Sequence, residues 1–178
     1  MKATKLLLLV LSCMLVIGCK KNNSDDEPTP PTPQYPIITM DSLKSYFPYE
    51  AIDRQIFNES NGYVGFTYIV KEATFASKDN KIIANVLMEG SIDEWNVNFK
   101  VQLTAEVTDQ HLLKSTFSVA VNGQPKAGSF EYDTAKNGVL PDKLNYSCGA
   151  IVEKDKGLTH YIDAYEQEWD LYHTYYKE

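Results

Sequence analysis

Residues 95–107 read WNVNFKVQLTAEV, and apolar and polar side chains alternate throughout this stretch. One face of it carries Val97, Phe99, Val101, Leu103 and Ala105. A period of two residues is typical of a β-strand with one buried face. The next strand is expected at residues 112–121. The Asn122-Gly123 pair that follows favours a two-residue hairpin, because both residue types tolerate positive φ.

Further runs of β-branched and aromatic residues lie between turn signals and predict strands at 63–76, 81–89, 127–132, 144–152 and 158–165. The last segment is ambiguous. Its apolar residues from Leu158 to Tyr176 fit a helical spacing, whereas the alternation from Trp169 and the aromatic enrichment favour a strand. We expect a strand from about Trp169.

Successive hairpins without long helices predict a mainly β fold, an antiparallel meander closed as a barrel or a sandwich. A short helical segment is expected before it. Asp41 is suited to cap a helix, and apolar residues recur at helical spacing within 41–58, where Pro48 should break or kink the helix. A loop is expected at 58–62.

The N-terminus has Lys2 and Lys5, then an apolar run over residues 6–17, then Gly18-Cys19. This order resembles the signal peptide and lipobox of bacterial lipoproteins. The resemblance implies that residues 1–18 are removed and that Cys19 is acylated. The apolar run is shorter than the roughly 20 residues that span a bilayer. The alternatives are a buried N-terminal helix and an uncleaved anchor.

Residues 24–27 are acidic and are similar to the export signal of Bacteroidetes surface lipoproteins, although a plain solvated linker explains them equally well. Lys20 does not match the inner-membrane retention signal, so the resemblance implies an outer-membrane lipoprotein facing the periplasm or the outside. Prolines are concentrated in 28–36, which favours a semi-rigid polyproline II spacer. We therefore expect a tether over 19–36 and one globular domain over 37–178.

The formal charge of −7 becomes −9 when Lys2 and Lys5 leave with the signal peptide. Arg54 is the only arginine in the chain. An acidic chain with one arginine is a poor nucleic-acid binder, because phosphate contacts need clustered basic residues. Removal of Cys13 and lipidation of Cys19 would leave Cys148 alone, so no intrachain disulfide is expected.

The stretch Gly62-Tyr63-Val64-Gly65, which enters the first predicted strand, is loosely similar to the opening of the calycin-like lipoproteins of Bacteroidetes. The resemblance implies a β-barrel and covers only the β region. The Gly-x-Trp of lipocalins is absent at this place.

Few features of the sequence support a catalytic site or a metal site. No nucleophile signature surrounds Cys148, and a free buried cysteine is the ordinary case. The spacing of His111, His160 and His173 matches no compact set of metal ligands. We therefore expect no catalytic residue, no metal, no cofactor and no enzymatic activity.

The aromatic residues of the last third are better candidates for a binding site: Tyr161, Tyr165, Trp169, Tyr172 and Tyr175. About half of the aromatic side chains there should be core, and the exposed remainder suits sugar stacking or protein contact. In addition, Asp41-Ser42-Leu43 and Asp133-Thr134-Ala135 resemble the O-glycosylation motif of Bacteroidetes, which would place glycans on Ser42 and Thr134.

The leading hypothesis is a non-enzymatic envelope protein, held on the membrane by its lipid anchor, whose β domain binds a glycan, an apolar small molecule or a protein. The alternatives are an envelope hydrolase with an unrecognised site and a structural accessory of a surface assembly. A cavity inside the β domain would favour a small-molecule ligand. An exposed aromatic patch would favour a glycan or a protein as the ligand. Carboxylates that converge in a cleft would favour an enzyme.

Overall fold

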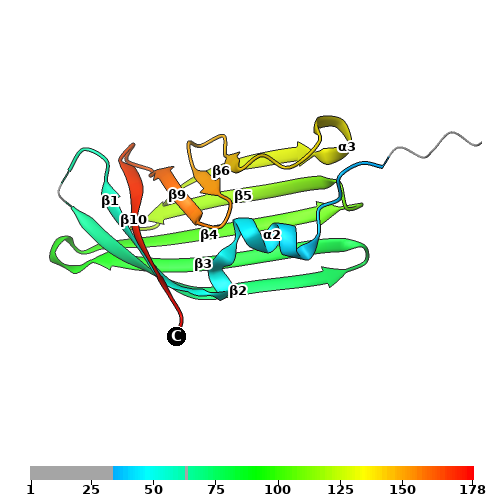
Figure 1. The fold of residues 1–178 in the computed structure, drawn as a ribbon. Helices are drawn as coiled ribbons and strands as arrows, with labels where there is room; N and C mark the ends of the chain where they lie inside the picture. Colours follow the sequence, from blue (N-terminus) through cyan, green and yellow to red (C-terminus); the bar gives the residue numbers. More distant parts are fainter. Residues whose placement is uncertain (1–33, 63) are drawn as a thin grey trace, which may run out of the picture. The chain divides into compact units, whose positions relative to one another are not determined.

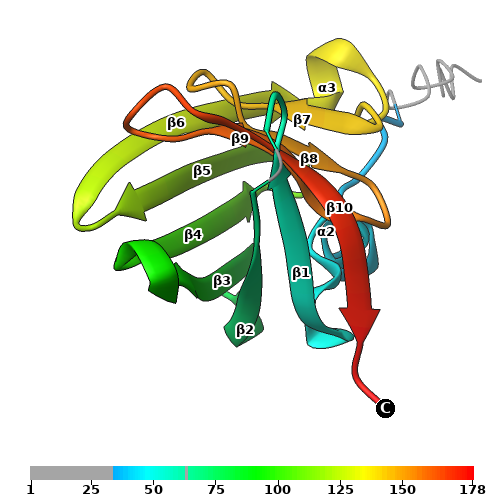
Figure 2. The same cartoon turned by 90° about the vertical axis from the view of Figure 1, so that its left-hand side faces the viewer.

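The computed structural model describes residues 34–62 and 64–178, and the compact unit begins at Gln34. Ten antiparallel strands form one sheet that curls into a nearly closed barrel (Figures 1 and 2). The prediction of a mainly β, antiparallel meander is confirmed, in its barrel form, since all ten strands belong to one hydrogen-bonded sheet. The predicted signal peptide, Cys19 and residues 19–33 of the tether lie outside the described residues.

The strands are β1 (Ile52–Glu59), β2 (Gly65–Lys78), β3 (Lys81–Ile92), β4 (Val97–Thr108), β5 (Leu112–Val121), β6 (Gln124–Asp133), β7 (Lys143–Asn145), β8 (Ile151–Glu153), β9 (Gly157–Ile162) and β10 (Glu168–Tyr176). Their order across the sheet is β6-β5-β4-β3-β2-β1-β10-β9-β8-β7. The helical pieces are α2 (Met40–Tyr46), the 3-10 turns η1 (Pro48–Glu50) and η2 (Asp93–Trp95), and α3 (Thr134–Asn137).

Strand β4 lies between β3 and β5 in the sheet, and its side chains alternate between buried and exposed as predicted. Phe99, Val101 and Leu103 are buried, while the residues between them face outward. The Asn122-Gly123 hairpin is confirmed: φ is 48° at Asn122 and 82° at Gly123, as a turn with two positive φ values requires. The C-terminal segment is a strand, as expected from about Trp169.

The two ends of the sheet meet between β6 and the turn that joins β7 to β8. The Ser147 N–H donates to the Ser129 carbonyl at 3.1 Å, and the Ser129 N–H donates to Ser147 Oγ at 3.0 Å. This approach is close, because a Cβ atom on Gly128 would lie 2.5 Å from the Cys148 nitrogen. Lys126 Nζ also contacts Glu166 at 2.9 Å. These contacts close the barrel on this side.

A second opening lies between β9 and β10, which pair only over Glu168–Asp170 of β10. The segment containing α2 and η1 contacts both sides of it, since the Glu50 carbonyl at the end of η1 accepts a hydrogen bond from Lys177 Nζ, just after β10, at 2.9 Å. Tyr49 Oη accepts the Leu158 N–H at 2.6 Å. The Ser45 carbonyl accepts the Asp155 N–H at 2.6 Å. The N-terminal helical segment is therefore part of the barrel wall in this region.

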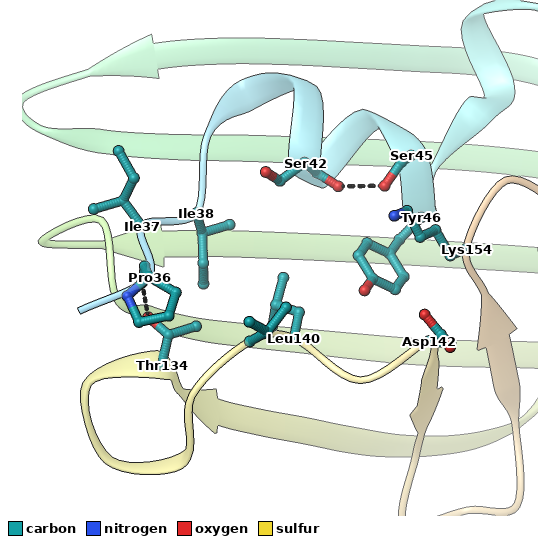
Figure 3. Close-up of a pocket in the computed structure, with 11 residues that line it drawn as sticks. Pro36, Ile37, Ile38, Ser42, Ser45, Tyr46, Thr134, Leu140, Asp142 and Lys154 are labelled. Atoms are coloured by element: carbon teal, nitrogen blue, oxygen red, sulfur yellow. Dashed lines mark hydrogen bonds between the residues drawn. The ribbon is translucent and has the colours of Figure 1, made fainter. Parts of the chain in front are cut away.

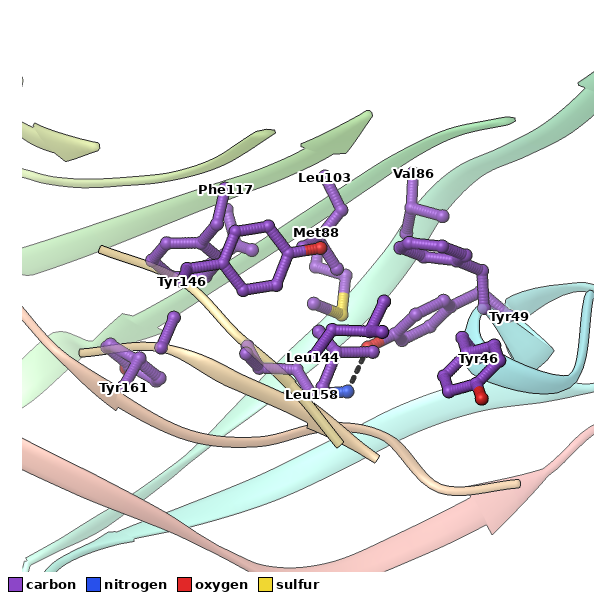
Figure 4. Packing of buried hydrophobic residues seen from close by; sticks show 14 of the residues in the cluster. Tyr46, Tyr49, Val86, Met88, Leu103, Phe117, Leu144, Tyr146, Leu158 and Tyr161 are labelled. Carbon is purple, nitrogen blue, oxygen red and sulfur yellow. Dashed lines mark hydrogen bonds between the residues drawn. The ribbon is translucent and has the colours of Figure 1, made fainter. Parts of the chain in front are cut away.

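Aromatic side chains fill the interior (Figure 4). Phe66 and Phe99 are stacked with ring centroids 4.0 Å apart. The hydroxyl oxygens of Tyr68 and Tyr161 are 2.9 Å apart in the same interior. Burying these large rings supplies much of the hydrophobic stabilisation, and each buried hydroxyl has a hydrogen-bond partner.

Two short helical pieces, α2 and η1, lie within the predicted range 41–58, and the break between them falls just before Pro48, as expected. The apolar residues from Ile52 onward, whose spacing also fits a helix, instead belong to β1. Ile56 and Phe57 pair with β10 and β2, so sheet pairing overrides the helical spacing of the apolar residues. The helix cap is Thr39, whose side chain accepts the Ser42 N–H, and not Asp41. Residues 144–152, predicted as one strand, form parts of β7 and β8 with a tight turn between them, where φ at Gly149 is 91°.

Candidate functional site

The barrel interior is packed with side chains. Tyr49, Phe117 and Tyr161 are fully buried. The ring centroid of Tyr161 lies 5.4 Å from that of Phe57 and 6.0 Å from that of Phe117, which are distances of packed aromatic pairs. The interior is therefore a hydrophobic core. Of the three ligand classes considered from the sequence, a glycan, an apolar small molecule and a protein, this packing argues against the small molecule.

One face of the outer surface gathers exposed rings and the only arginine of the chain. Arg54 on β1 lies directly opposite Tyr175 on β10 and directly opposite Ile69 on β2. Tyr175 is 39% exposed and Ile69 47% exposed. His173 and Tyr172 on β10 are also exposed, Tyr172 to 72%. We name this surface the β10–β1–β2 face: Arg54, Ile69, Tyr172, His173 and Tyr175.

Within the β10–β1–β2 face, Arg54 and His173 each contact Tyr175. The Arg54 guanidinium carbon lies 4.6 Å from the ring centroid of Tyr175, a cation–π distance. The His173 ring packs edge-on against Tyr175, with centroids 4.5 Å apart and an interplanar angle of 72°. These two contacts restrict the Tyr175 ring, and Tyr175 in turn orients Arg54.

A trough of about 530 Å³ adjoins this face, over β2, β3 and the start of β4. The groups that line it include Thr67, Ile69, Lys71, Glu89, Ser91 and Asn98. Ile69 belongs to both the trough and the β10–β1–β2 face, so the two surfaces are continuous. The combined surface offers exposed rings at one end and hydroxyl, amide and charged groups at the other.

The structure places the predicted binding aromatics in three locations. Tyr161 is fully buried, and Trp169 is 4% exposed, so both are core residues and neither is part of an exposed patch. Tyr172 and Tyr175 lie on the β10–β1–β2 face. Tyr165 is exposed on the turn between β9 and β10 and is not one of the residues of that face.

Trp169 is held in the core by a buried carboxylate. Trp169 Nε1 donates to Asp163 Oδ2 at 3.0 Å. Asp163 Oδ1 accepts the backbone N–H groups of Tyr165 at 2.8 Å and of Gln167 at 3.1 Å. Three donated hydrogen bonds satisfy a carboxylate that is almost fully buried. Asp163 is therefore a structural residue of this turn.

Ser60 and His160 both contact Asp170, but the three side chains are not arranged as a catalytic triad. Ser60 Oγ donates to Asp170 Oδ2, and His160 Nδ1 lies 2.7 Å from Asp170 Oδ1. A hydrolytic triad needs the imidazole between the hydroxyl and the carboxylate, whereas here the carboxylate is in the middle. Partial burial raises the pKa of Asp170, but its hydrogen bonds with Ser60 and His160 outweigh this effect and leave the pKa below its ordinary value.

Cys148 is half-buried in the turn between β7 and β8, beside Gly128. The described contacts of the imidazoles go elsewhere: His111 to the Pro36 carbonyl, His160 to Asp170, and His173 to Tyr175. Among residues 34–62 and 64–178, no group of three or more His, Cys, Asp or Glu side chains is arranged to hold a metal ion. Within the same ranges, no helix has the length and apolar character needed to cross a membrane.

A smaller hollow of about 160 Å³ lies between α2 and the segment that follows α3 (Figure 3). Ile38 and Leu140 form its apolar part, and Asp142 and Lys154 lie at its polar end. Tyr46 Oη already donates to the Pro141 carbonyl at 2.7 Å. Burial, with smaller contributions from Asp142 and Asp155, raises the pKa of Tyr46, so this hydroxyl keeps its proton for that bond.

Both predicted O-glycosylation residues line this hollow. Thr134 is 2% exposed, and its hydroxyl donates to the Pro36 carbonyl. Ser42 is half-buried, with Oγ 2.9 Å from Thr39 Oγ1. In the folded protein, therefore, both hydroxyl groups already have hydrogen-bond partners.

Arg54 and Ile69 were not among the binding residues predicted from the sequence. Their role depends on strand register, since each becomes a neighbour of Tyr175 only through the pairing of β1 with β10 and β2. One signal was available: a single arginine in an acidic chain. Trp95 was expected at the start of a strand, but it is the last residue of η2 and is exposed. Strand β4 begins only after Asn96, whose φ is 52°.

Comparisons of the chain with protein-family models, with curated proteins and with solved structures find no match. The geometry of the β10–β1–β2 face and the adjoining trough is therefore the basis for assigning a function.

Proposed function

We propose that this protein is a lipid-anchored protein of the bacterial outer membrane that binds a carbohydrate polymer and performs no chemistry on it. One observation carries the proposal. Tyr175 is exposed on an outer face with Arg54 over its ring, and Tyr172 is exposed three residues earlier on the same strand, while Tyr161 and Trp169 are buried in a filled core. Binding therefore takes place on the outside of the barrel.

The chemistry of the surface favours a carbohydrate over a protein partner. Tyrosine offers an apolar ring face and a hydroxyl group, which together suit a sugar ring. The adjoining trough presents Thr67, Ser91 and Asn98, whose side chains both donate and accept hydrogen bonds. The centre of a protein interface is usually depleted of charged groups, whereas Lys71 and Glu89 line this trough.

The lipid anchor is supported by the sequence, through its similarity to the lipobox of bacterial lipoproteins. Replacing Cys19 by alanine should abolish acylation and processing after Gly18, and the precursor should leave the detergent phase in a partition assay. Processing and membrane attachment that persist in Cys19→Ala would contradict the anchor.

Affinity electrophoresis of the purified protein through gels containing different polysaccharides tests the binding proposal. Retardation is expected with at least one polymer, and it should fall in Tyr172→Ala and in Tyr175→Ala. Tyr165→Ala is the matched control, because it removes an exposed tyrosine outside the β10–β1–β2 face. Equal retardation of all four proteins would place binding elsewhere. A protein that no polysaccharide retards would contradict carbohydrate binding, and release of shortened products would contradict the absence of chemistry.

A further inference from the structure

We infer that the polymer is anionic, with carboxylate or sulfate groups on its sugars, and that Arg54 binds these groups. This inference rests on the proposed function, because it names the class of carbohydrate for the same face. It depends on how Arg54 is held, on which of its donors are free, and on the charges around it.

Arg54 is oriented before any ligand arrives. Its guanidinium carbon lies 4.6 Å from the centroid of the Tyr175 ring, and the His173 ring makes a T-shaped contact with that ring, with centroids 4.5 Å apart. A guanidinium group is planar and offers paired N–H donors that match the two oxygens of a carboxylate or sulfate. Holding it in place lowers the entropy lost on binding, so each hydrogen bond to an anion yields more affinity.

The donors of Arg54 are largely free within the part of the chain that the structure describes. Its ion pair there is with the neighbouring Asp53, between Nε and Oδ2 at 3.7 Å, and both side chains are about half exposed. That distance is too long for a good hydrogen bond, and an exposed pair of this kind is worth little. A ligand anion can therefore bind the guanidinium group without breaking a strong internal contact.

The trough adds a second cation on the same outer surface. Lys71 lines it together with Ile69, which is the direct strand partner of Arg54. The carboxylate that also lines it, Glu89, lies 3.8 Å from Lys100 Nζ, which offsets its charge. A polymer lying along both surfaces would place successive anionic sugars near Arg54 and near Lys71.

The negative charge of the whole chain does not exclude an anionic ligand. At physiological ionic strength, charges separated by more than about 8 Å are largely screened. The local groups therefore decide the sign of the interaction. Since the attraction is between exposed charges, binding should weaken as salt is added.

Polygalacturonate and its fully methyl-esterified form are a matched pair of probes, because esterification removes the charge and keeps the polymer backbone. Dextran sulfate and dextran are the corresponding pair for sulfate. We expect the purified protein to bind one or both anionic polymers at least about tenfold more tightly than the neutral partner, as for a charged hydrogen-bonded pair. Added salt should reduce this difference.

Arg54→Ala should remove most of this preference, a loss of about tenfold or more for the anionic polymer. Its effect on the affinity for the neutral partner should be clearly smaller, so that the ratio of the two affinities falls. Arg54→Lys should be intermediate, because lysine keeps the charge but not the paired donors. Lys114→Ala is the control, since it removes the same charge from the outer face of β5, where Lys114 lies 3.7 Å from Glu131. Circular dichroism and melting temperature verify that each variant is folded.

Equal binding of charged and neutral polymers, unchanged in Arg54→Ala, would overturn the anionic ligand and leave carbohydrate binding in place. Failure of every polysaccharide to bind would overturn the proposed function itself. Polyglutamate is the third probe. If it binds through Arg54 as tightly as the anionic polysaccharides, the face recognises acidic peptides and the carbohydrate assignment is wrong.

Discussion

The hydroxyl oxygens of Tyr68 and Tyr161 lie 2.9 Å apart inside the barrel, and neither side chain is exposed. Burial raises the pKa of both hydroxyl groups, so both keep their protons and one donates to the other. Phe57 packs edge-on against both rings, at 5.5 and 5.4 Å. These two buried hydroxyl groups satisfy each other among packed rings, which is the behaviour of a core and not of a ligand cavity.

Removing one of these hydroxyl groups leaves the other buried without its partner. Tyr68→Phe and Tyr161→Phe should each lower the free energy of unfolding by about 1–3 kcal/mol. The double variant should lose less than the sum, because both polar groups are then absent. Urea denaturation of the four proteins measures this coupling. Strictly additive losses would mean that the two hydroxyl groups do not depend on each other.

Asp163→Asn tests the carboxylate that holds Trp169. An amide N–H₂ in place of Oδ2 would face Trp169 Nε1, so two donors would meet in a buried place. We expect a loss of about 1–3 kcal/mol in unfolding free energy and a changed tryptophan fluorescence spectrum. Asp79→Asn, in an exposed turn where φ is 51°, is the control. Equal stability of the two variants would show that the Asp163 contacts contribute nothing.

Gly128→Ala tests the closure of the barrel. The added Cβ would lie 2.5 Å from the Cys148 nitrogen and 2.6 Å from its sulfur. The variant should lose about 1–3 kcal/mol, as expected for overpacking. Cys148→Ala alone should cost about 1 kcal/mol or less. The double variant should stay destabilised, since the backbone nitrogen remains. Restored stability in the double variant would instead assign the conflict to the sulfur.

Acid should weaken the contacts of Asp170. Its pKa is below the ordinary value: partial burial raises it, but the hydrogen bonds with Ser60 and His160 have the larger combined effect. A carboxyl group with a lowered folded-state pKa stabilises the protein above its unfolded-state pKa. That stabilisation is lost as the pH falls from about 4 through the folded-state value. Asp170→Asn should therefore lose less stability than the parent between pH 7 and pH 3, measured by urea midpoints. The same loss in both proteins would contradict this assignment.

The sequence predicted those parts of the fold that local patterns determine. Alternation in residues 95–107 and the Asn122-Gly123 pair gave the central hairpins, because a strand with one buried face needs period two and a tight hairpin needs positive φ. The helical spacing of residues 52–57 did not predict the strand that they form, and the reason is physical. The spacing of Ile52 and Ile56 fits a helix, and only pairing with β10 and β2 makes this stretch a strand.

The sequence predicted that the candidate site involves the aromatic C-terminal segment, but not which of its aromatic side chains are exposed. Trp169 and Tyr175 should share a face if β10 is regular, yet the first is buried and the second exposed. The reason is a bulge: Leu171 and His173 oppose the consecutive residues Phe57 and Ile56, so Tyr172 has no partner. A bulge reverses which side chains face inward beyond it. No alternation pattern reveals that reversal before the register is known.

The most direct test of the account is the location of the bound polymer. Backbone amide chemical shifts of the protein, followed while the best-retained polysaccharide is added, report the contacted residues. We predict the largest changes along β10, β1 and β2, at Arg54, Ile69 and Tyr175. Changes confined to core residues such as Tyr161, or to the hollow beside Tyr46 and Leu140, would contradict binding on the outer face.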